Sequence, residues 1–414
     1  MISELRKHLT ASNFFFLKGN DQFIYEDVQS LFAIDENSSG GNNPISYTGE
    51  TGNLLPDLSS QEWRFGFVSY DFKNRLEKLH SNNTDRFHFR DFLFFQPTQL
   101  MVHKAGEWKS IIGDKSLDVS GLELEGPPSS ETPPTCLLKP RFSRKEYLDR
   151  VLQIKTAIRL GDIYELNFCQ EFYAEDTVID PIAVFERLNR ISPAPFAAFC
   201  RFGDNYVISS SPERFLKKTG NTLLAQPIKG TRPRSADPRE DSRLKEELRM
   251  DEKERAENVM IVDLVRNDLS RIASKGSVKV EELFGVYSFE QVHQLISSIS
   301  ANVKPGTTFA DILQATFPMG SMTGAPKVRA MQLIDELENT RRGLYSGTLG
   351  FITPEGDFDF SVVIRTIFYN ASTKYLSFQV GSAITDKSDP EQEYQECLLK
   401  AKALVQALNG EIKD

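Results

Sequence analysis

The stretch GTLGFITPEGDFDFSVVIRTIFYNASTKYLSFQV, residues 347–380, decides the fold class. It contains three apolar and aromatic runs, at 347–352, 360–368 and 375–380, which turn-forming residues separate without any helical segment between them. Strands that follow one another directly favour antiparallel pairing over alternating strand-helix units. The sequence therefore predicts an α+β fold with antiparallel sheets.

Helices are predicted on both sides of this stretch, over 327–338 before it and over 390–408 after it. A third long helix is predicted over 251–272, where the apolar residues cover much of the surface. Ser143 and Glu146 have the spacing of a capping box and predict the start of another helix.

The first part of the chain, residues 1–140, is predicted to be rich in strands and to belong to the same fold. The runs 63–70 and 87–95 carry aromatic residues at the density typical of strands. The part ends in a proline-rich connector, 122–140, for which the absence of periodicity predicts irregular structure. The second part is predicted to span residues 141–414.

Composition excludes several classes of function. The 414 residues carry a net charge of -9, which argues against nucleic acid or an anionic membrane as a partner. The four cysteines have no metal-ligand spacing and favour a reducing compartment over a disulfide framework. With no secretory signal and no apolar run near the roughly 20 residues that span a bilayer, a cytoplasmic location is predicted.

Two of the predicted helices each place a pair of glutamates on one face. Glu254 and Glu257 are three residues apart, as are Glu393 and Glu396, and four converging carboxylates suit Mg²⁺. Glutamates at this spacing are more often a solvated helix face, and Glu396 has Lys400 as an alternative partner four residues on.

The segment GSMTGAPK, residues 320–327, predicts a helix start with free backbone N–H groups, which suits a carboxylate or phosphate. Thr323 or Gly324 is expected to cap this helix, with Pro326 in an early helical position. An ordinary capped helix start remains the alternative, because the spacing is not that of a nucleotide-binding phosphate loop.

Two cations stand in unusual positions. Arg365 interrupts an apolar strand run, where it is suited either to a bidentate carboxylate contact or to a structural salt bridge. Lys229 lies close to Arg232 and Arg234, and neighbouring cations together with partial burial favour the nucleophilic, unprotonated amine. A solvated surface lysine is the alternative.

In combination these segments resemble the chorismate-utilising enzymes, a family that includes anthranilate synthase component I, the aminodeoxychorismate synthases and the isochorismate and salicylate synthases. The blocks that carry the resemblance are GDIYELNFCQ (161–170), SPERF (211–215), PIKGTRPR (227–234), ERAENVMIVDLVRNDLSRIA (254–273), GSMTGAPKVRAM (320–331), YSGTLGF (345–351), IRT (364–366) and GSAITDKSDPEQEYQE (381–396). The resemblance implies a single large α/β sandwich of two packed antiparallel sheets flanked by helices, with the chorismate-binding catalytic region in 141–414.

The resemblance also implies roles for individual residues. Glu257 and Glu396 would hold Mg²⁺, with Glu254 and Glu393 in support. Substrate contacts are implied for Gly230, Thr231, Ser321, Tyr345, Arg365, Gly381, Ser382 and Ala383. The catalytic residues implied are Lys229, as the covalent nucleophile, and Glu213, as the acid that protonates the departing hydroxyl. For this role Glu213 would need a raised pKa.

Within the family, the residue before Gly-Thr in the PIKGT block is informative. Anthranilate synthases typically carry Ala there, whereas aminodeoxychorismate synthases, the para-aminobenzoate and folate branch, often carry the Lys seen here as Lys229. Glu165 stands where isochorismate and salicylate synthases have a water-activating Lys, which argues against water as the nucleophile. Gln294 stands where many members have a His, and a catalytic role for the neighbouring His293 is doubtful because adjacent strand residues face opposite sides.

The resemblance favours amination of chorismate to 4-amino-4-deoxychorismate, with ammonia from a separate glutamine amidotransferase subunit. Anthranilate synthase component I is the nearest alternative, and a non-catalytic chorismate-binding subunit is an alternative of another class.

Overall fold

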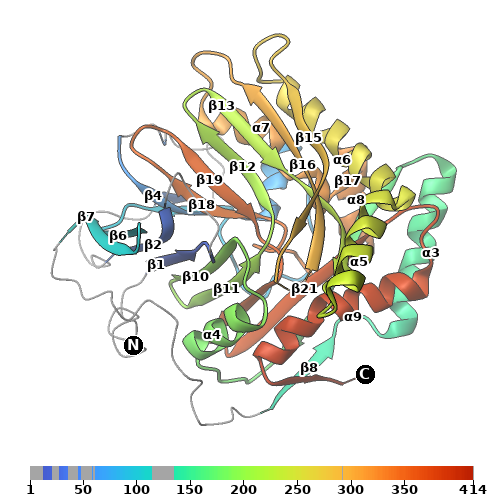
Figure 1. The fold of residues 1–414 in the computed structure, drawn as a ribbon. Helices are drawn as coiled ribbons and strands as arrows, with labels where there is room; N and C mark the ends of the chain where they lie inside the picture. Colours follow the sequence, from blue (N-terminus) through green and yellow to red (C-terminus); the bar gives the residue numbers. More distant parts are fainter. Residues whose placement is uncertain are drawn as a thin grey trace.

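The computed structural model describes residues 13–20, 28–35, 45–47, 58, 61–113, 135–290 and 292–413. Within these ranges the chain forms one sheet of 12 strands and one of 10, with helices packed around them (Figure 1). The strands pair antiparallel throughout this part of the chain, apart from one short parallel pair at the C-terminal end. The predicted sandwich of two antiparallel sheets is confirmed.

The first sheet draws its strands from both ends and the middle of the chain. In pairing order they are β22 (Gly410–Ile412), β8 (Cys136–Pro140), β9 (Glu165–Ala174), β21 (Tyr375–Ile384), β20 (Thr366–Asn370), β11 (Asn205–Ser211), β10 (Phe196–Phe202), β1 (Asn13–Lys18), β2 (Val28–Asp35), β6 (Gln99–Lys104) and β7 (Glu107–Ile112), with β17 (Gly324–Ala325) beside β9.

The second sheet is likewise assembled from distant segments. In pairing order its strands are β14 (Ile228–Pro233), β16 (Val292–Asn302), β13 (Thr222–Gln226), β12 (Arg214–Thr219), β19 (Phe358–Val362), β18 (Thr348–Ile352), β4 (Arg64–Val68), β5 (Phe92–Phe95) and β3 (Ile45–Tyr47), with β15 (Lys279–Ser288) beside β16.

Helices cover the outer faces. The α-helices are α2 (Lys73–Leu76), α3 (Arg144–Leu160), α4 (Pro181–Ile191), α5 (Pro238–Met250), α6 (Glu252–Ser270), α7 (Phe309–Thr316), α8 (Lys327–Leu337) and α9 (Pro390–Ala407), and the 3-10 helices are η1 (Tyr70–Phe72) and η3 (Gly320–Met322). In Figure 1, α4 and α9 lie along the lower side of the molecule and α3 stands at its right, while α5 and α6 run beside β15 and β16. Within the described residues, no helix is both long enough and apolar enough to cross a membrane.

Strand β1 shows why the apolar runs are continuous and not alternating. Phe15 faces the core between the sheets and contacts Phe65 of β4, with 5.4 Å between ring centroids. Phe16 faces the opposite side and contacts Phe185 of α4 at 6.0 Å. Because both faces of this strand are buried, the four central positions, 14–17, are all apolar, and each such side chain contributes roughly 1.5–3 kcal/mol through burial.

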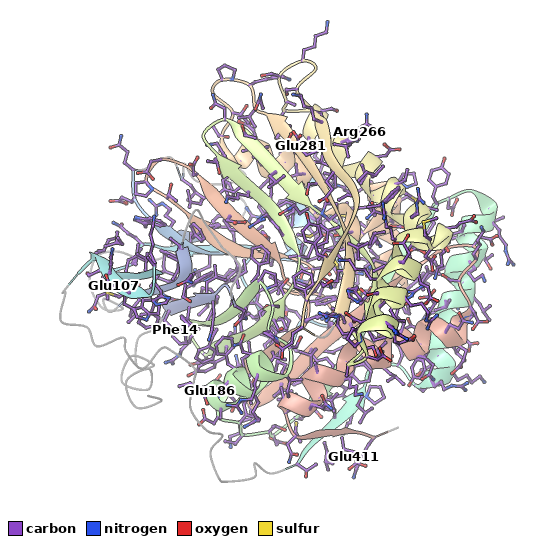
Figure 2. The ribbon with its side chains drawn as sticks, in the orientation of Figure 1. Phe14, Glu107, Glu186, Arg266, Glu281 and Glu411 are labelled. Atoms are coloured by element: carbon purple, nitrogen blue, oxygen red, sulfur yellow. The ribbon has the colours of Figure 1, made fainter. Side chains whose placement is uncertain are left out.

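Apolar and charged side chains also occupy different parts of the molecule. Figure 2 shows Phe14 of β1 inside the fold, where it is 1% exposed, and Glu107 and Glu411 at its periphery. The apolar and charged residues thus separate as the binary pattern of the sequence requires.

The four predicted helices are confirmed. The capping box is present, since the Ser143 side chain accepts from the Glu146 amide and the Glu146 carboxylate accepts from the Ser143 amide. Helices α6, α8 and α9 match the predicted 251–272, 327–338 and 390–408 to within two residues at each end. The predicted cap of α8 is wrong, because Pro326 itself occupies the N-cap position and no side chain caps the helix.

Three strand predictions require correction. The predicted strand 360–368 is the end of β19 and the start of β20, separated where Arg365 adopts a left-handed φ of 49°. In the run 87–95 only Phe92–Phe95 is a strand. Phe87 and Phe89 lie outside it, and their rings pack against Phe368. The end of the predicted irregular connector, Cys136–Pro140, is strand β8, while 122–134 lies outside the described residues.

Candidate active site

The chain crosses between the two sheets at two adjoining places, and each crossing carries a predicted site residue. Glu213 lies between β11 and β12, and Arg365 lies between β19 and β20. The amide of Val362 donates to the Glu213 carbonyl at 3.0 Å, and the amide of Ser210 donates to the Arg365 carbonyl at 3.1 Å. The two side chains therefore start from neighbouring points between the sheets.

Glu213 is a buried carboxyl with a raised affinity for its proton. It is 4% exposed, and the Ser321 hydroxyl donates to its Oε1 at 2.7 Å. Burial raises the pKa of Glu213 to about 7, although the hydrogen bond from Ser321 and the Lys229 ammonium oppose the shift. The carboxyl is therefore partly protonated near neutral pH, as an acid that protonates a leaving hydroxyl must be.

Arg365 has no ion-pair or hydrogen-bond partner for its side chain in the described part of the chain, so the salt-bridge alternative fails there. Burial lowers the pKa of Arg365. A guanidinium that is taken out of water and left without an acidic partner is a ready site for a carboxylate ligand.

A β-bulge in β14 sets the position of Lys229. Ile228 pairs with Ile296 and Thr231 pairs with Gln294, so the strand holds one extra residue at Lys229 and Gly230. Gly230 has a φ of 95°, and a Cβ at this position would lie 3.0 Å from the Glu254 carboxylate. Glycine thus permits both the bulge and the close approach of β14 to α6.

The side chain of Lys229 is 10% exposed, so the alternative of a solvated surface lysine is wrong. Its Nζ lies 3.8 Å from Oε1 of Glu165 on β9, which belongs to the other sheet. The predicted cationic surroundings are also wrong. Arg232 pairs with Asp251 at 2.6 Å and Arg234 with Asp241 at 2.8 Å, so both arginines are neutralised by acids.

Two of the four candidate metal carboxylates, one from α6 and one from α9, lie on either side of a shared cation. Nζ of Lys253 lies 3.8 Å from Oε1 of Glu257 on α6 and 3.8 Å from Oε1 of Glu393 on α9. Burial would lower the pKa of Lys253, but these two carboxylates, with Glu254 and Glu396, raise it. The Lys253 ammonium group therefore lies between a glutamate of α6 and a glutamate of α9.

Two features bear on whether a divalent ion fits here. Burial raises the pKa of Glu257 to about 7 against the opposing charges of Lys229 and Lys253, and its Oε1 has no hydrogen-bond partner in the described chain. Carboxylate oxygens are the ligands that Mg²⁺ prefers, and it commonly keeps several waters. The donor set therefore fits Mg²⁺, although no three acidic, histidine or cysteine side chains among the described residues already form a compact ligand cluster.

The other two candidate metal carboxylates, Glu396 and Glu254, each lie close to a different cation. Lys400 approaches Oε1 of Glu396 at 2.7 Å, as the alternative for this residue predicted. Burial would raise the pKa of Glu396, but Lys400 outweighs it and lowers the pKa. Arg232 lies 3.5 Å from Glu254, whose pKa is nevertheless raised by burial.

The predicted substrate contacts lie around these groups. On β21, Gly381 and Ala383 are partly exposed while Ser382 between them is buried, so Ser382 contributes its backbone to this face and not its side chain. A Cβ at Gly381 would lie 2.5 Å from the carbonyl oxygen of Phe168. Tyr345 is buried and accepts a weak hydrogen bond from the Cys169 thiol at 3.6 Å.

A partly open pocket with a cavity volume of about 30 Å³ borders Glu213 and Ser321. Apolar side chains supply most of its remaining lining, among them Leu216, Val265 and Met319. The space beside the buried Glu213 carboxyl is therefore about large enough for a water molecule.

His293 is held on the face away from Gln294. Its Nε2 contacts Asp241 of α5 at 3.0 Å and its Nδ1 contacts the Ser288 hydroxyl at 2.9 Å. With both ring nitrogens occupied, the imidazole ties α5 to β16, and the doubt about a catalytic role is supported. Gln294 is buried on the face of Thr231, and its amide oxygen has no partner among the described residues.

Reasoning from the sequence missed how closely three residues approach the site. The motifs of the sequence mark Glu165 only by the absence of a lysine and Lys400 only as a partner of Glu396, and they do not include Lys253. Lys400 also donates to the Gly381 carbonyl at 2.8 Å, which fixes α9 against β21. The i, i+4 spacing from Lys253 to Glu257 is a signal that could have found one of them.

Comparisons with known proteins show the family and the fold. The family model described as chorismate binding enzyme matches residues 19–406. The chain is 38% identical to aminodeoxychorismate synthase component 1 of Salmonella typhimurium, over 86% of this chain and 78% of that protein. It is 44% identical to aminodeoxychorismate synthase of Streptomyces griseus over 70% of this chain, a match that spans only 40% of the longer relative.

Among solved structures, anthranilate synthase component I from Streptococcus pneumoniae superposes with a TM-score of 0.71 at 28% identity, covering 94% of this chain and 90% of that one. The similarity thus extends over nearly the whole length of both chains.

Proposed function

The chain belongs to the family of chorismate-binding enzymes, and from this premise we propose that it aminates chorismate to 4-amino-4-deoxychorismate through a covalent intermediate on Lys229. One observation carries the proposal: the Lys229 amine is enclosed between the sheets beside Glu165, in the same site as the Glu213 carboxyl. An anthranilate synthase would need no amine here, because its nucleophile is ammonia itself.

The buried groups divide the work of the first half-reaction. The lone pair of the Lys229 amine forms a bond to C2 of the ring, the two ring double bonds shift, and the C4–O bond breaks. Glu213 gives its proton to the departing hydroxyl, which leaves as water. The pKa of about 7 at Glu213 suits a group that must hold a proton before this step and release it during the step.

The second half-reaction reverses the shift. Ammonia bonds to C4, the double bonds return to their original positions, and the C2–N bond breaks with its electron pair going back to Lys229. Glu213, now a carboxylate, accepts a proton from the new amine and is ready for another cycle. One residue thus serves as acid and then as base.

The remaining residues bind and orient the substrate. Arg365 would take the pyruvyl carboxylate together with Tyr345 and the β21 backbone, and the ring carboxylate would lie against Gly230, Thr231 and Ser321. Glu257 and Glu396 would hold Mg²⁺, with Glu254 and Glu393 in support. When bound, the ion would supply Lewis-acid polarisation of the ring carboxylate.

The ammonia donor we propose is a glutamine amidotransferase subunit. The Salmonella relative is named a component 1, which supports a partner component for this chain as well. We place the enzyme in the cytoplasm, supported by four cysteines that are all buried and unpaired.

Anthranilate synthase component I is the second candidate, favoured by the similarity to the Streptococcus pneumoniae structure. Chromatography of the products from chorismate, Mg²⁺ and ammonium, with and without an added aminodeoxychorismate lyase, separates the two. We expect a 4-amino product that yields para-aminobenzoate only when the lyase is added. Fluorescent anthranilate formed without the lyase would contradict the proposal, and no aminated product at all would indicate a binding subunit.

A further inference from the structure

Glu165 is a buried carboxylate for which the proposed reaction has so far given no role. It is the first residue of β9 and is 1% exposed. Its Oε1 lies 3.8 Å from Nζ of Lys229, and its Oε2 has no hydrogen-bond partner in the described part of the chain. A carboxylate taken out of water without hydrogen bonds is costly, so the arrangement calls for a function.

The proposed nucleophile needs a proton acceptor close by. Lysine amines in model peptides have a pKa of about 10.4, so a lysine must lose a proton before it can attack. The charged groups that face Lys229 are Glu165 on β9, Glu213 at the crossing after β11, Glu257 on α6 and Glu396 on α9.

Three of these four carboxyl groups already have another partner or another proposed role. Glu213 must hold its own proton for the leaving hydroxyl and accepts from Ser321, Glu396 pairs with Lys400, and Glu257 is a candidate metal ligand. Among the described residues, Glu165 is the acid that lies within ion-pair distance of the amine.

We propose that Glu165 is a further catalytic residue, which takes a proton from the Lys229 ammonium and returns it at the end of each cycle. This inference rests on the proposed function. The separation of 3.8 Å exceeds a hydrogen bond, and catalytic contacts of this kind commonly shorten once substrate closes the site.

The protons balance over the cycle. Glu165 accepts one proton from Nζ, and the freed lone pair attacks C2 while Glu213 protonates the hydroxyl that leaves. After ammonia displaces the lysine, Nζ recovers its electron pair as a neutral amine and takes the proton back from Glu165. Chorismate and ammonia have become the aminated product and water, and both acids are restored.

The test is the pH dependence of Glu165→Gln, which keeps the shape of the side chain and removes the proton acceptor. At pH 7 we expect kcat/KM to fall about 10²- to 10⁴-fold. The ratio of wild-type to variant rates should shrink by about tenfold per pH unit toward pH 9, because hydroxide then deprotonates the lysine. Taking the ratio removes the pH dependence of Glu213, which both enzymes share.

Glu171→Gln is the matched control. Glu171 is a buried carboxylate on the same strand, but it pairs with Arg141 at 2.7 Å outside the site. Its ratio to the wild type should not change with pH.

A Glu165→Gln variant with the wild-type rate, or with the same fractional loss at every pH, would overturn the inference. If the variant does not fold, Glu165→Asp decides the matter. We expect it to keep the pH dependence of the wild type at a lower rate, and a pH dependence that rises about tenfold per unit would contradict the role. A wild-type enzyme that yields no 4-amino product would instead count against the proposed function.

Discussion

Two buried ion pairs in this molecule are built in different ways. Arg342 and Glu338 form two hydrogen bonds, at 2.6 and 2.9 Å, and Arg342 also donates to the carbonyls of Met322 and Asn167. Lys229 and Glu165 approach only to 3.8 Å. Both pairs are buried, yet only the first is fully engaged by the protein.

The difference separates a structural pair from a functional one. The Arg342 guanidinium donates to backbone carbonyls in η3 and β9. It therefore fixes two segments that carry candidate site residues. Around Lys229, by contrast, one oxygen of Glu165 and one of Glu257 have no hydrogen-bond partner in the described residues. Buried polar atoms without partners are rare in folded proteins, and where they gather they indicate where a ligand binds.

The largest effect is expected on the functional pair. Lys229→Ala should lower kcat by at least about 10³-fold, as removal of a covalent nucleophile does in other enzymes. Steady-state amination with ammonium measures this, with Lys279→Ala on the exposed edge of β15 as the control. Full activity of the Lys229 variant would remove the distinction between the two pairs.

On the structural pair the effect should appear in stability. Arg342→Met leaves the buried Glu338 carboxylate without its partner and should lower the free energy of unfolding by about 3–5 kcal/mol. Lys229→Met should change it by less than about 1 kcal/mol, because the lysine makes no short hydrogen bond. Urea unfolding of both variants tests this, and equal losses would show that the pairs are alike.

A smaller effect is expected from Glu257→Gln in metal-free protein. Burial raises the pKa of Glu257 to about 7, so the destabilisation it causes is absent below about pH 4, grows as pH rises from about 4.5 to 7, and stays constant above that. The variant should therefore be more stable than the wild type at pH 8, by up to about 3 kcal/mol, and equal to it near pH 4. A variant that is less stable at pH 8 would show that this carboxylate is satisfied after all.

The smallest effect concerns Lys253, the cation between α6 and α9. Because its side chain is 47% exposed, each of its ion pairs should contribute only about 0.2–1 kcal/mol. With two such pairs, Lys253→Ala should therefore tighten Mg²⁺ binding by no more than about 30-fold in calorimetry, with exposed Arg249→Ala as the control. Weaker binding in the Lys253 variant would mean that the ammonium supports the ion and does not compete with it.

Local signals in the sequence predicted the elements that carry the site. The capping box at Ser143, the apolar faces of α6 and α9 and the three-residue spacing of their glutamates depend on neighbours along the chain, and these features are present in the structure. The antiparallel sandwich followed from strands that succeed one another without helices.

What the sequence could not predict depends on contacts between distant segments. Nothing near Arg365 indicates that the chain changes sheets there, since the apolar residues on either side suit one continuous strand equally well. The partner of Lys229 lies 64 residues away, as the numbers of Glu165 and Lys229 show, and the adjacent arginines that seemed to set its charge are occupied by other acids. Burial of Glu213 likewise arises from the packing of both sheets.

The most direct test of the account is the mass of the intact protein after incubation with chorismate and Mg²⁺ in the absence of ammonium. We predict an increase equal to chorismate less one water, mapped by peptide digestion to Lys229 and discharged when ammonium is added. Unmodified protein under conditions where ammonium supports rapid turnover, or an adduct on any other side chain, would contradict it.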